Sequence, residues 1–405
     1  MRVLLISQYY APEVTAARVR VEAFAEGLAA RGHEVEVICE VPNHPRGVVD
    51  EEYRRRFSVR REANGVRVRH LWVHARPRKT TVNRLLFYGT FAATATLAGI
   101  GSGRPDVVVV SSPPLPSGAA AAAVASRYRV PWVFDVRDLW PEAAVVLGEL
   151  RGERAIRAAE WLERRLYASA DAIVTVTEPF RAAIAAKVAD PAKIAVIPNG
   201  TSSLWMEAGE AEPDRAAARL PEDGFVWAYA GNVGIAQGLE SAVEAAAMLG
   251  DGFRFLVIGD GPQLQAVRER AAALPPGRIE FRPLMEPRQA ASTLRACDAL
   301  LVPLTARPEL AKFVPSKLFD CCAVGRPVIV AAAGESQRLV GESGAGLAVP
   351  PEEPAALADA VRRLRGDRVL AERLSEGGRA FAGRHLREDG VGRLEGVLRS
   401  VVSGG

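Results

Sequence analysis

Residues 313–331, FVPSKLFDCCAVGRPVIVA, predict a short helix that begins at a proline, ends at a glycine turn and leads directly into a buried strand. Pro315 suits the first helical position, because its missing N–H would have no intrahelical partner there. Three free backbone amides would then lie at a helix N-terminus, where an anion is stabilised, namely those of Ser316, Lys317 and Leu318. The Lys317 ammonium could join them on a diphosphate, while Asp320, one turn on, accepts from ribose hydroxyls. The segment predicts a nucleoside-diphosphate site, with ordinary helix capping as the alternative.

The composition predicts a globular protein of two or three domains. The chain has 405 residues, of which 49% are hydrophobic and 25% charged, so it can bury a substantial core. Its four cysteines form no disulfide framework and no signal peptide precedes the first predicted strand, which together favour a cytoplasmic protein. The five histidines lack the spacing of metal ligands, so we expect no metal site.

The first half of the chain alternates buried strands with helical segments. Residues 3–7, VLLIS, are a continuous apolar run, and a helical segment and a second strand, HEVEVIC (33–39), follow. This strand–helix–strand arrangement recurs as far as residue 200, which is typical of a doubly wound parallel sheet. Residues 1–200 are therefore predicted to form an N-terminal Rossmann-like domain.

The second half repeats this pattern after a break. Residues 201–223 are polar and contain two prolines, as expected of a linker. From residue 224, five apolar strands separated by helical stretches predict a second Rossmann-like domain, 224–385. Residues 386–405 form a tail that could pack back on the first domain. Two such domains would face each other across a cleft between the carboxyl ends of their sheets, where ligands of such folds bind.

Two glycine-rich turns follow strands of the second domain. GNVGIAQG (231–238) and IGDGP (258–262) would let backbone amides approach an anion closely, although glycine-rich turns also connect strands and helices without any ligand. The candidate donor-binding residues in these turns are Gly231, Asn232, Gln237, Gly259, Asp260, Gly261 and Pro262. The first strand of the chain lacks a GxGxxG turn, which argues against a dinucleotide oxidoreductase.

A charged loop, DVRDLWPE (135–142), follows a strand of the first domain. It gathers three carboxylates, an arginine and a tryptophan at the strand end. One interpretation is a structural ion pair between Arg137 and Asp138. The other is a site that presents a carboxylate and an aromatic surface to a substrate.

Together these motifs resemble a GT-B glycosyltransferase of family 4, the retaining and metal-independent group. The matching segments run along most of the chain and include GHEVEVI (32–38), IPNG (197–200), YAGNVG (229–234) and GRPVIVA (325–331). A narrower resemblance, to the N-acetylfucosamine-type transferases of bacterial O-antigen and capsule assembly, rests on PNHPRG, SSPP, VRDLWPE, GNVGIAQGLE and VPSKLFD. The resemblance implies that the second domain holds a nucleoside-diphosphate sugar and the first an acceptor.

The chain departs from the family pattern at three places. Gln237 stands where the family usually has lysine, Lys312 and Asp320 stand where it has two glutamates, and NGTS (199–202) replaces NGxD. Because Gln237 carries no charge, Lys317 or Lys312 must supply the positive charge beside the diphosphate.

The sequence thus predicts a retaining, metal-independent glycosyltransferase that moves a sugar from a UDP-hexosamine to a cell-envelope glycan or lipid-linked acceptor, without nucleic acid as a partner. Positioned amides and Lys317 would stabilise the departing diphosphate. Asp138, with Arg137, would act on the acceptor side, where the other candidates are Asn43, His44, Trp140 and Glu142. The alternatives are a nucleotide-sugar epimerase on the same fold and a non-catalytic nucleotide-sugar-binding partner.

Residues 76–103 suggest contact with an anionic membrane surface at the inner face of the cell membrane. Residues 85–103 carry no charge, and a basic cluster precedes them, consisting of Arg76, Arg78, Lys79 and Arg84. The run is weakly hydrophobic, so an interfacial or buried helix fits better than a spanning one. The alternative is that this helix packs wholly against the first sheet.

Overall fold

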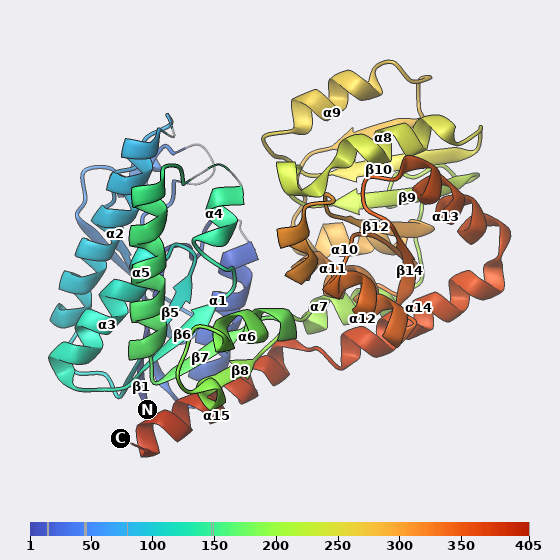
Figure 1. The fold of residues 1–405 in the computed structure, drawn as a ribbon. Helices are drawn as coiled ribbons and strands as arrows, with labels where there is room; N and C mark the ends of the chain where they lie inside the picture. The colour runs from blue at the N-terminus through green and yellow to red at the C-terminus, as the bar shows by residue number, and fades with distance from the viewer. Residues whose placement is uncertain (14–15, 44–46, 79, 147, 149, 405) are drawn as a thin grey trace. The chain divides into compact units, whose positions relative to one another are not determined.

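The computed structural model describes residues 1–13, 16–43, 47–78, 80–146, 148 and 150–404. The chain divides into two compact units (Figure 1). The first contains Met1–Pro198 together with Arg387–Gly405, and the second contains Asn199–Leu386. Each unit is built on its own, largely parallel sheet, which confirms the predicted α/β class with two doubly wound domains.

The sheet of the first unit has the strand order β3-β4-β2-β1-β5-β6-β7-β8. Only β3 runs antiparallel to its neighbour. The strands are β1 (Arg2–Ser7), β2 (Glu34–Glu40), β3 (Ser58–Ala63), β4 (Val66–Leu71), β5 (Val107–Ser112), β6 (Trp132–Val136), β7 (Ala172–Thr175) and β8 (Ile194–Val196). At the centre, Leu5 of β1 lies opposite Val37 on one side and Val109 on the other. These strands are continuous apolar runs because helices cover both of their faces.

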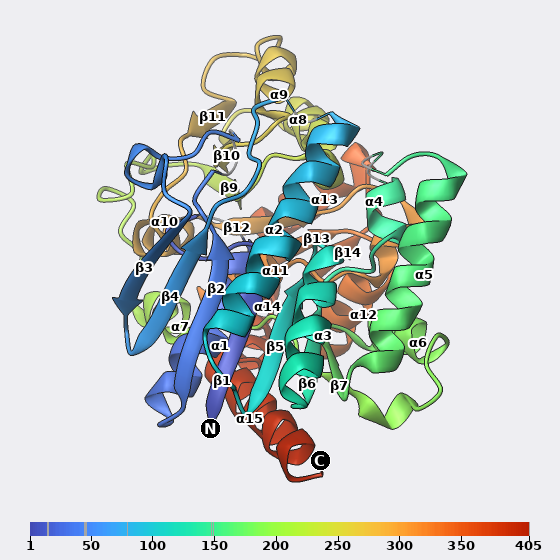
Figure 2. The same cartoon turned by 90° about the vertical axis from the view of Figure 1, so that its left-hand side faces the viewer.

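Helices cover the two faces of this sheet. Its helical segments are α1 (Ala16–Ala30), η1 (Glu51–Tyr53), α2 (Thr81–Gly101), α3 (Pro116–Tyr128), α4 (Glu142–Val146), α5 (Glu153–Ser169), α6 (Glu178–Ala185), η2 (Pro191–Lys193) and α15 (Arg387–Ser403). Figure 2 shows α2 and α3 in front of the strands and α1 and α15 on the opposite face. The C-terminal helix α15 therefore completes the core of the first unit. It comes so close to α1 that a Cβ on Gly27 would lie 2.6 Å from Cγ2 of Val391.

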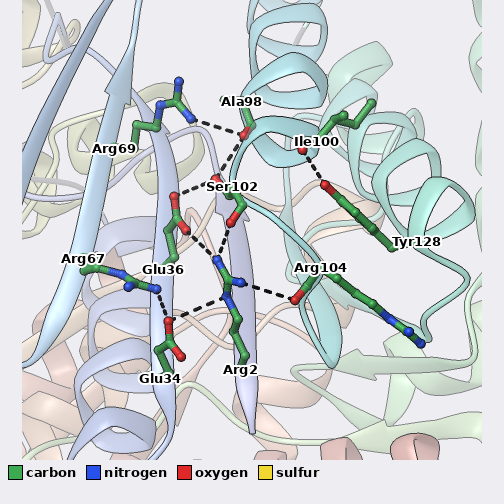
Figure 3. A network of polar contacts seen from close by, with 10 residues as sticks. All are labelled: Arg2, Glu34, Glu36, Arg67, Arg69, Ala98, Ile100, Ser102, Arg104 and Tyr128. Atoms are coloured by element: carbon green, nitrogen blue, oxygen red, sulfur yellow. Dashed lines mark hydrogen bonds and ion pairs between the residues drawn. The ribbon is translucent and has the colours of Figure 1, made fainter.

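A polar network fixes the C-terminal end of α2 to the start of β1 and β2 (Figure 3). The guanidinium of Arg2 lies 3.7 Å from Glu34 and 4.0 Å from Glu36, and it donates to the carbonyls of Ser102 and Arg104. The hydroxyl of Ser102, the residue that caps α2, donates to Glu36 at 2.7 Å. This end of α2 is therefore held against the sheet.

The sheet of the second unit is parallel throughout, with the order β11-β10-β9-β12-β13-β14. Its strands are β9 (Phe225–Ala230), β10 (Phe253–Ile258), β11 (Ile279–Arg282), β12 (Ala299–Pro303), β13 (Val328–Ala331) and β14 (Gly346–Val349). Its helical segments are α7 (Ser203–Glu210), η3 (Ile235–Gln237), α8 (Leu239–Met248), α9 (Leu264–Ala271), α10 (Pro287–Arg295), η4 (Pro308–Lys312), α11 (Ser316–Ala323), α12 (Glu335–Ser343), α13 (Pro354–Gly366) and α14 (Arg368–Gly383). Each face of the sheet has its own apolar core.

The structure differs from the sequence-based expectation in the second unit. Residues 201–223, expected to be a linker, contain α7, which packs so closely on α11 that a Cβ on Gly209 would lie 2.2 Å from the Ala323 carbonyl oxygen. Strand β14 was not expected, because four residues that begin with glycine give too short an apolar run. Helix α11 begins at Ser316, one residue later than expected, and Pro315 caps it.

Candidate functional site

The two glycine turns of the second unit pack backbone against backbone. Strands β9 and β10 are neighbours, with Ala230 opposite Ile258, so both turns emerge side by side at the carboxyl edge of the sheet. The amide of Gly231 donates to the Ile258 carbonyl at 2.9 Å. Gly259 has φ +146°, and a Cβ there would lie 1.9 Å from the Gly231 carbonyl oxygen. Only glycine allows this approach, so the two turns pack together with no side chain between Gly231 and Gly259.

Two predicted donor-binding side chains hold these turns in shape. Oε1 of Gln237 accepts from the Gly234 amide at 3.1 Å, so Gln237 folds back on its own turn. Oδ1 of Asp260 accepts from the Gly261 amide at 2.8 Å. Pro262 is exposed and follows the second turn. Positive charge beside the glycine turns must therefore come from elsewhere, because Gln237 supplies none.

Lys317, in the first turn of α11, supplies that charge. Its ammonium lies 3.8 Å from the ring centroid of Tyr229 and donates to the phenol oxygen at 2.5 Å. The phenol in turn donates to the Asn232 carbonyl at 2.5 Å. A Cβ on Gly231 would lie 2.8 Å from the lysine nitrogen, so Lys317 reaches the first glycine turn. Burial of the ammonium lowers the pKa of Lys317 to about 7.

Two other predicted groups of α11, the Asp320 carboxylate and the Leu318 amide, form hydrogen bonds within the second unit. Oδ1 of Asp320 accepts from the hydroxyl of the buried Thr201 at 2.8 Å. The amide of Leu318 was expected to be free for an anion, but it donates to the Pro315 carbonyl at 2.9 Å. That expectation was wrong, because the first turn of the helix closes on its cap. Ser316 is half-buried at the helix start.

In the first unit, the candidate Arg137 belongs to a buried network at the carboxyl ends of β5 and β6. Arg20 and Asp135 form an ion pair at 2.9 Å with side chains 4% and 1% exposed. Ser111 donates to Asp135 at 2.9 Å, and Nε of Arg137 donates to Ser111 at 2.7 Å. Burial lowers the pKa of Arg137. Arg137 also lies 3.9 Å from Asp135, so it is part of this buried ionic network.

Another buried polar cluster lies where β1 and β2 end. The amide nitrogen of Asn43 donates to Glu13 at 2.7 Å, and its side chain donates to Glu40 at 2.8 Å. Burial, and then the neighbouring Glu13, raise the pKa of Glu40 well above its usual value. Asn43 is thus placed at the carboxyl edge of the sheet, whereas His44 lies outside the described residues.

The two other acceptor-side candidates are Trp140 and Glu142. The half-buried Trp140 packs edge-to-face on Tyr88 of α2, with ring centroids 6.0 Å apart. Glu142 is the first residue of α4 and is half-buried. Within the described ranges, no three or more His, Cys, Asp or Glu side chains are grouped so that they could hold a metal ion.

Sequence reasoning missed several residues of these sites. Tyr229 was taken only as part of a buried strand, and its distance from Lys317 in sequence hides their contact. Arg20 on α1 and Asp135 on β6 meet only once the sheet has formed, and Glu13 reaches Asn43 from a loop. The sequence did contain one signal for Thr201, because it follows the NG dipeptide that closes the first domain.

The fold and the two edge sites define a class, the GT-B glycosyltransferases, with two Rossmann-like domains in one chain. Family models match both halves: the glycosyl transferase 4-like domain matches residues 15–200, and glycosyl transferases group 1 matches residues 224–367. The chain belongs to family 4 of the GT-B glycosyltransferases, as the sequence predicts.

Individual comparisons agree with this assignment. The chain is 26% identical to the putative colanic acid biosynthesis glycosyl transferase WcaI of Escherichia coli K12, over 96% of this chain and 98% of WcaI. Its fold is similar to that of sucrose-phosphate synthase from Thermosynechococcus elongatus, with a TM-score of 0.76, 20% identity and full coverage of both chains. It is also similar to Anabaena HepE solved with UDP and glucose, with a TM-score of 0.72, 15% identity and 98% of each chain covered.

Proposed function

We propose that this glycosyltransferase moves a sugar, with retention of anomeric configuration, from a UDP-hexosamine to a cell-envelope glycan or lipid-linked acceptor. The observation that carries the donor assignment is the position of Lys317 against the Gly231–Asn232 turn. A buried cation beside a glycine turn matches the charge of a diphosphate. The HepE structure with UDP supports a uridine nucleotide by analogy of fold, and the hexosamine rests on the resemblance to the N-acetylfucosamine-type branch.

The second unit carries the electrostatic part of the mechanism in this proposal. As the bond to the sugar breaks, negative charge grows on the diphosphate. The Lys317 ammonium is already held beside the Gly231 turn, so it stabilises this charge without reorganising. Asp320, held by Thr201, accepts from the ribose hydroxyls. A fixed cation can stabilise the departing diphosphate, so the proposed transfer proceeds without a metal ion.

The first unit supplies the acceptor-side groups in this proposal. Asp138 and Arg137 follow β6, and Asn43 and Trp140 lie at the same edge or close to it. The name of WcaI, a colanic acid biosynthesis transferase, supports an envelope glycan as acceptor. The epimerase and non-catalytic alternatives are not favoured, because the matched family models and WcaI are described as transferases.

We also propose that α2 attaches the protein reversibly to an anionic membrane. The helix is not wholly packed on the sheet: Phe91 and Ala95 are fully buried, but a stripe of large apolar side chains is exposed, consisting of Val82 (65%), Leu85 (61%), Leu86 (45%), Leu97 (66%) and Ile100 (36%). Arg76 and Arg78 are exposed just before the helix. Lys79, the other basic residue expected there, lies outside the described residues. No described helix combines the length and apolarity that crossing a bilayer requires.

Transfer and attachment are tested separately. Incubation of the protein with a UDP-hexosamine and a lipid-diphosphate acceptor should give a glycosylated lipid whose new linkage keeps the donor's anomeric configuration, and excess EDTA should leave the rate unchanged. Activity that EDTA abolishes and Mn²⁺ restores would contradict the metal-free site. UDP release with no dependence on the acceptor would contradict transfer.

Flotation with vesicles tests the membrane contact. The protein should float with anionic vesicles at low salt and be released as salt rises, because surface charges are screened within about 10 Å at 0.1 M. Leu85→Gln with Leu97→Gln, on the exposed stripe, should abolish flotation while UDP binding stays unchanged. A protein that stays at the bottom of the gradient at low salt would favour a soluble acceptor instead.

A further inference from the structure

The Lys317 ammonium occupies an unusual environment for a cation. Of the described residues, the titratable group that acts on it electrostatically is Cys321, and no carboxylate does so. Its neighbours are instead the ring and phenol oxygen of Tyr229, a residue with no exposed surface. A ring face and one oxygen stabilise an ammonium less than a carboxylate does. The charged form of Lys317 is therefore destabilised by burial, and an anion that binds beside it would stabilise it.

We propose that Tyr229 is a positioning residue that holds Lys317 at the glycine turn, and that Lys317 takes up a proton when the donor diphosphate binds. Tyr229 is suited to this because its hydroxyl has two contacts, accepting from Lys317 and donating to the Asn232 carbonyl. It thereby joins the lysine of α11 to the turn after β9. This inference rests on the proposed role of the second unit in donor binding.

The groups around Lys317 support a proton step at that side chain. The titratable groups that face it are Tyr229 on β9 and Cys321 on α11 itself. Burial raises the pKa of Tyr229, and burial raises the pKa of Cys321 to about 12, so both stay neutral and protonated near pH 7. Lys317 has a pKa of about 7 because of burial, so it is the group that changes charge there. A bound diphosphate favours the charged form and raises that pKa.

Calorimetry at several pH values tests the proton step. UDP-N-acetylglucosamine is the probe, because both of its phosphates are esterified and stay singly ionised at neutral pH. Titrations in buffers with different ionisation enthalpies give the protons taken up per ligand. Uptake should rise from about 0.1 at pH 6 to about 0.9 at pH 8, and Kd should weaken about tenfold over the same range, as expected for an unliganded pKa of about 7.

Three variants identify the group responsible. Lys317→Arg stays charged at all of these pH values, so proton uptake and the pH dependence of Kd should both disappear. Lys317→Met should also give a flat profile, at a weaker affinity, which covers the case in which arginine does not fit. Tyr229→Phe keeps the ring but removes the oxygen, so the midpoint of the Kd profile should move to lower pH and Kd at pH 7 should weaken about fivefold or more.

The outcomes separate this inference from the proposed function. Tyr128→Phe, which removes a phenol that donates to a carbonyl in the first unit, is the matched control and should behave like wild type. Binding without proton uptake, or a pH profile that persists in both Lys317 variants, would overturn the inference while leaving donor binding intact. A Tyr229→Phe profile identical to wild type would overturn the positioning role. Failure of both UDP and UDP-N-acetylglucosamine to bind at any pH would overturn the proposed function itself.

Discussion

At the carboxyl edge of the second sheet the backbone itself shapes the site, whereas at the carboxyl edge of the first sheet buried side chains do. Gly231 and Gly259 come together because neither has a side chain, and a single lysine stands beside them. In the first unit, Arg20 and Asp135 fill the corresponding edge with a buried ion pair. One edge is therefore shaped by closely packed backbone beside a lysine, and the other presents a fixed arrangement of polar side chains.

The difference indicates how each edge should respond to substitution. A backbone surface is damaged by adding atoms, because any side chain collides with the neighbouring turn. A side-chain network is damaged by removing atoms, because the partner that remains is a buried charge. The predictions below use this contrast.

The largest effect is expected for Asp135→Asn in the first unit. Arg20 would keep its charge without its partner, in a position where its side chain is only 4% exposed. Such a break costs about 3–5 kcal/mol of unfolding free energy. Denaturant unfolding, followed by the tryptophans of the first unit, measures it. Asp359→Asn, which breaks a surface pair with Arg362, is the control and should cost less than about 1 kcal/mol. Equal losses in the two variants would contradict a buried network.

Gly259→Ala should damage the second edge by adding one carbon. Its Cβ would lie 1.9 Å from a carbonyl oxygen at φ +146°, so the two turns must separate. We expect a loss of about 3 kcal/mol in stability and loss of measurable UDP binding by calorimetry. Gly341→Ala, in α12 with nothing within 4 Å, should be neutral or stabilising by about 1 kcal/mol. UDP binding that survives Gly259→Ala would show that the turns do not form the site.

A smaller, pH-dependent effect is expected for Glu40→Gln. The folded state raises the pKa of Glu40, so wild type loses stability as the pH rises from the unfolded pKa towards the folded one. Glutamine resembles the protonated acid. The free energy of unfolding of the variant should therefore rise relative to that of wild type as the pH rises from 5 to 8, by at most about 1.4 kcal/mol per pH unit. Unfolding at several pH values measures this gain. The exposed variant Glu153→Gln should show no such trend, and a constant difference for Glu40→Gln would contradict a protonated Glu40.

Much of the fold could be predicted from the sequence because it depends on local patterns. Apolar runs such as VLLIS and the glycine turns after β9 and β10 identify a parallel sheet and its carboxyl edge without any long-range information. Strand β14 escaped prediction because a four-residue run gives no periodicity. Helix α7 escaped because prolines and polar residues nearby resemble a linker, although Gly209 allows the helix to pack on α11.

Site residues could be predicted from the sequence only where they lie together in one segment. Lys317 and Asp320 lie on one helix whose start and composition are visible in the chain. Tyr229 could not be assigned, because a buried aromatic residue in a strand is ordinary core until a lysine 88 positions away is found against it. The pairing of Arg20 with Asp135 is likewise set by sheet order, since the two are 115 residues apart.

The measurement that tests the account most directly is calorimetric titration of UDP into wild type, Lys317→Ala and Lys312→Ala at pH 6, where the wild-type lysine is charged. Removing a charge-assisted hydrogen bond to phosphate costs about 1.5–3 kcal/mol, so Lys317→Ala should bind about 10- to 150-fold more weakly. Lys312→Ala, in η4, should change Kd by much less. An unchanged Kd in a folded Lys317→Ala protein, with the loss appearing in Lys312→Ala instead, would contradict the assignment of the diphosphate to Lys317 and the glycine turns.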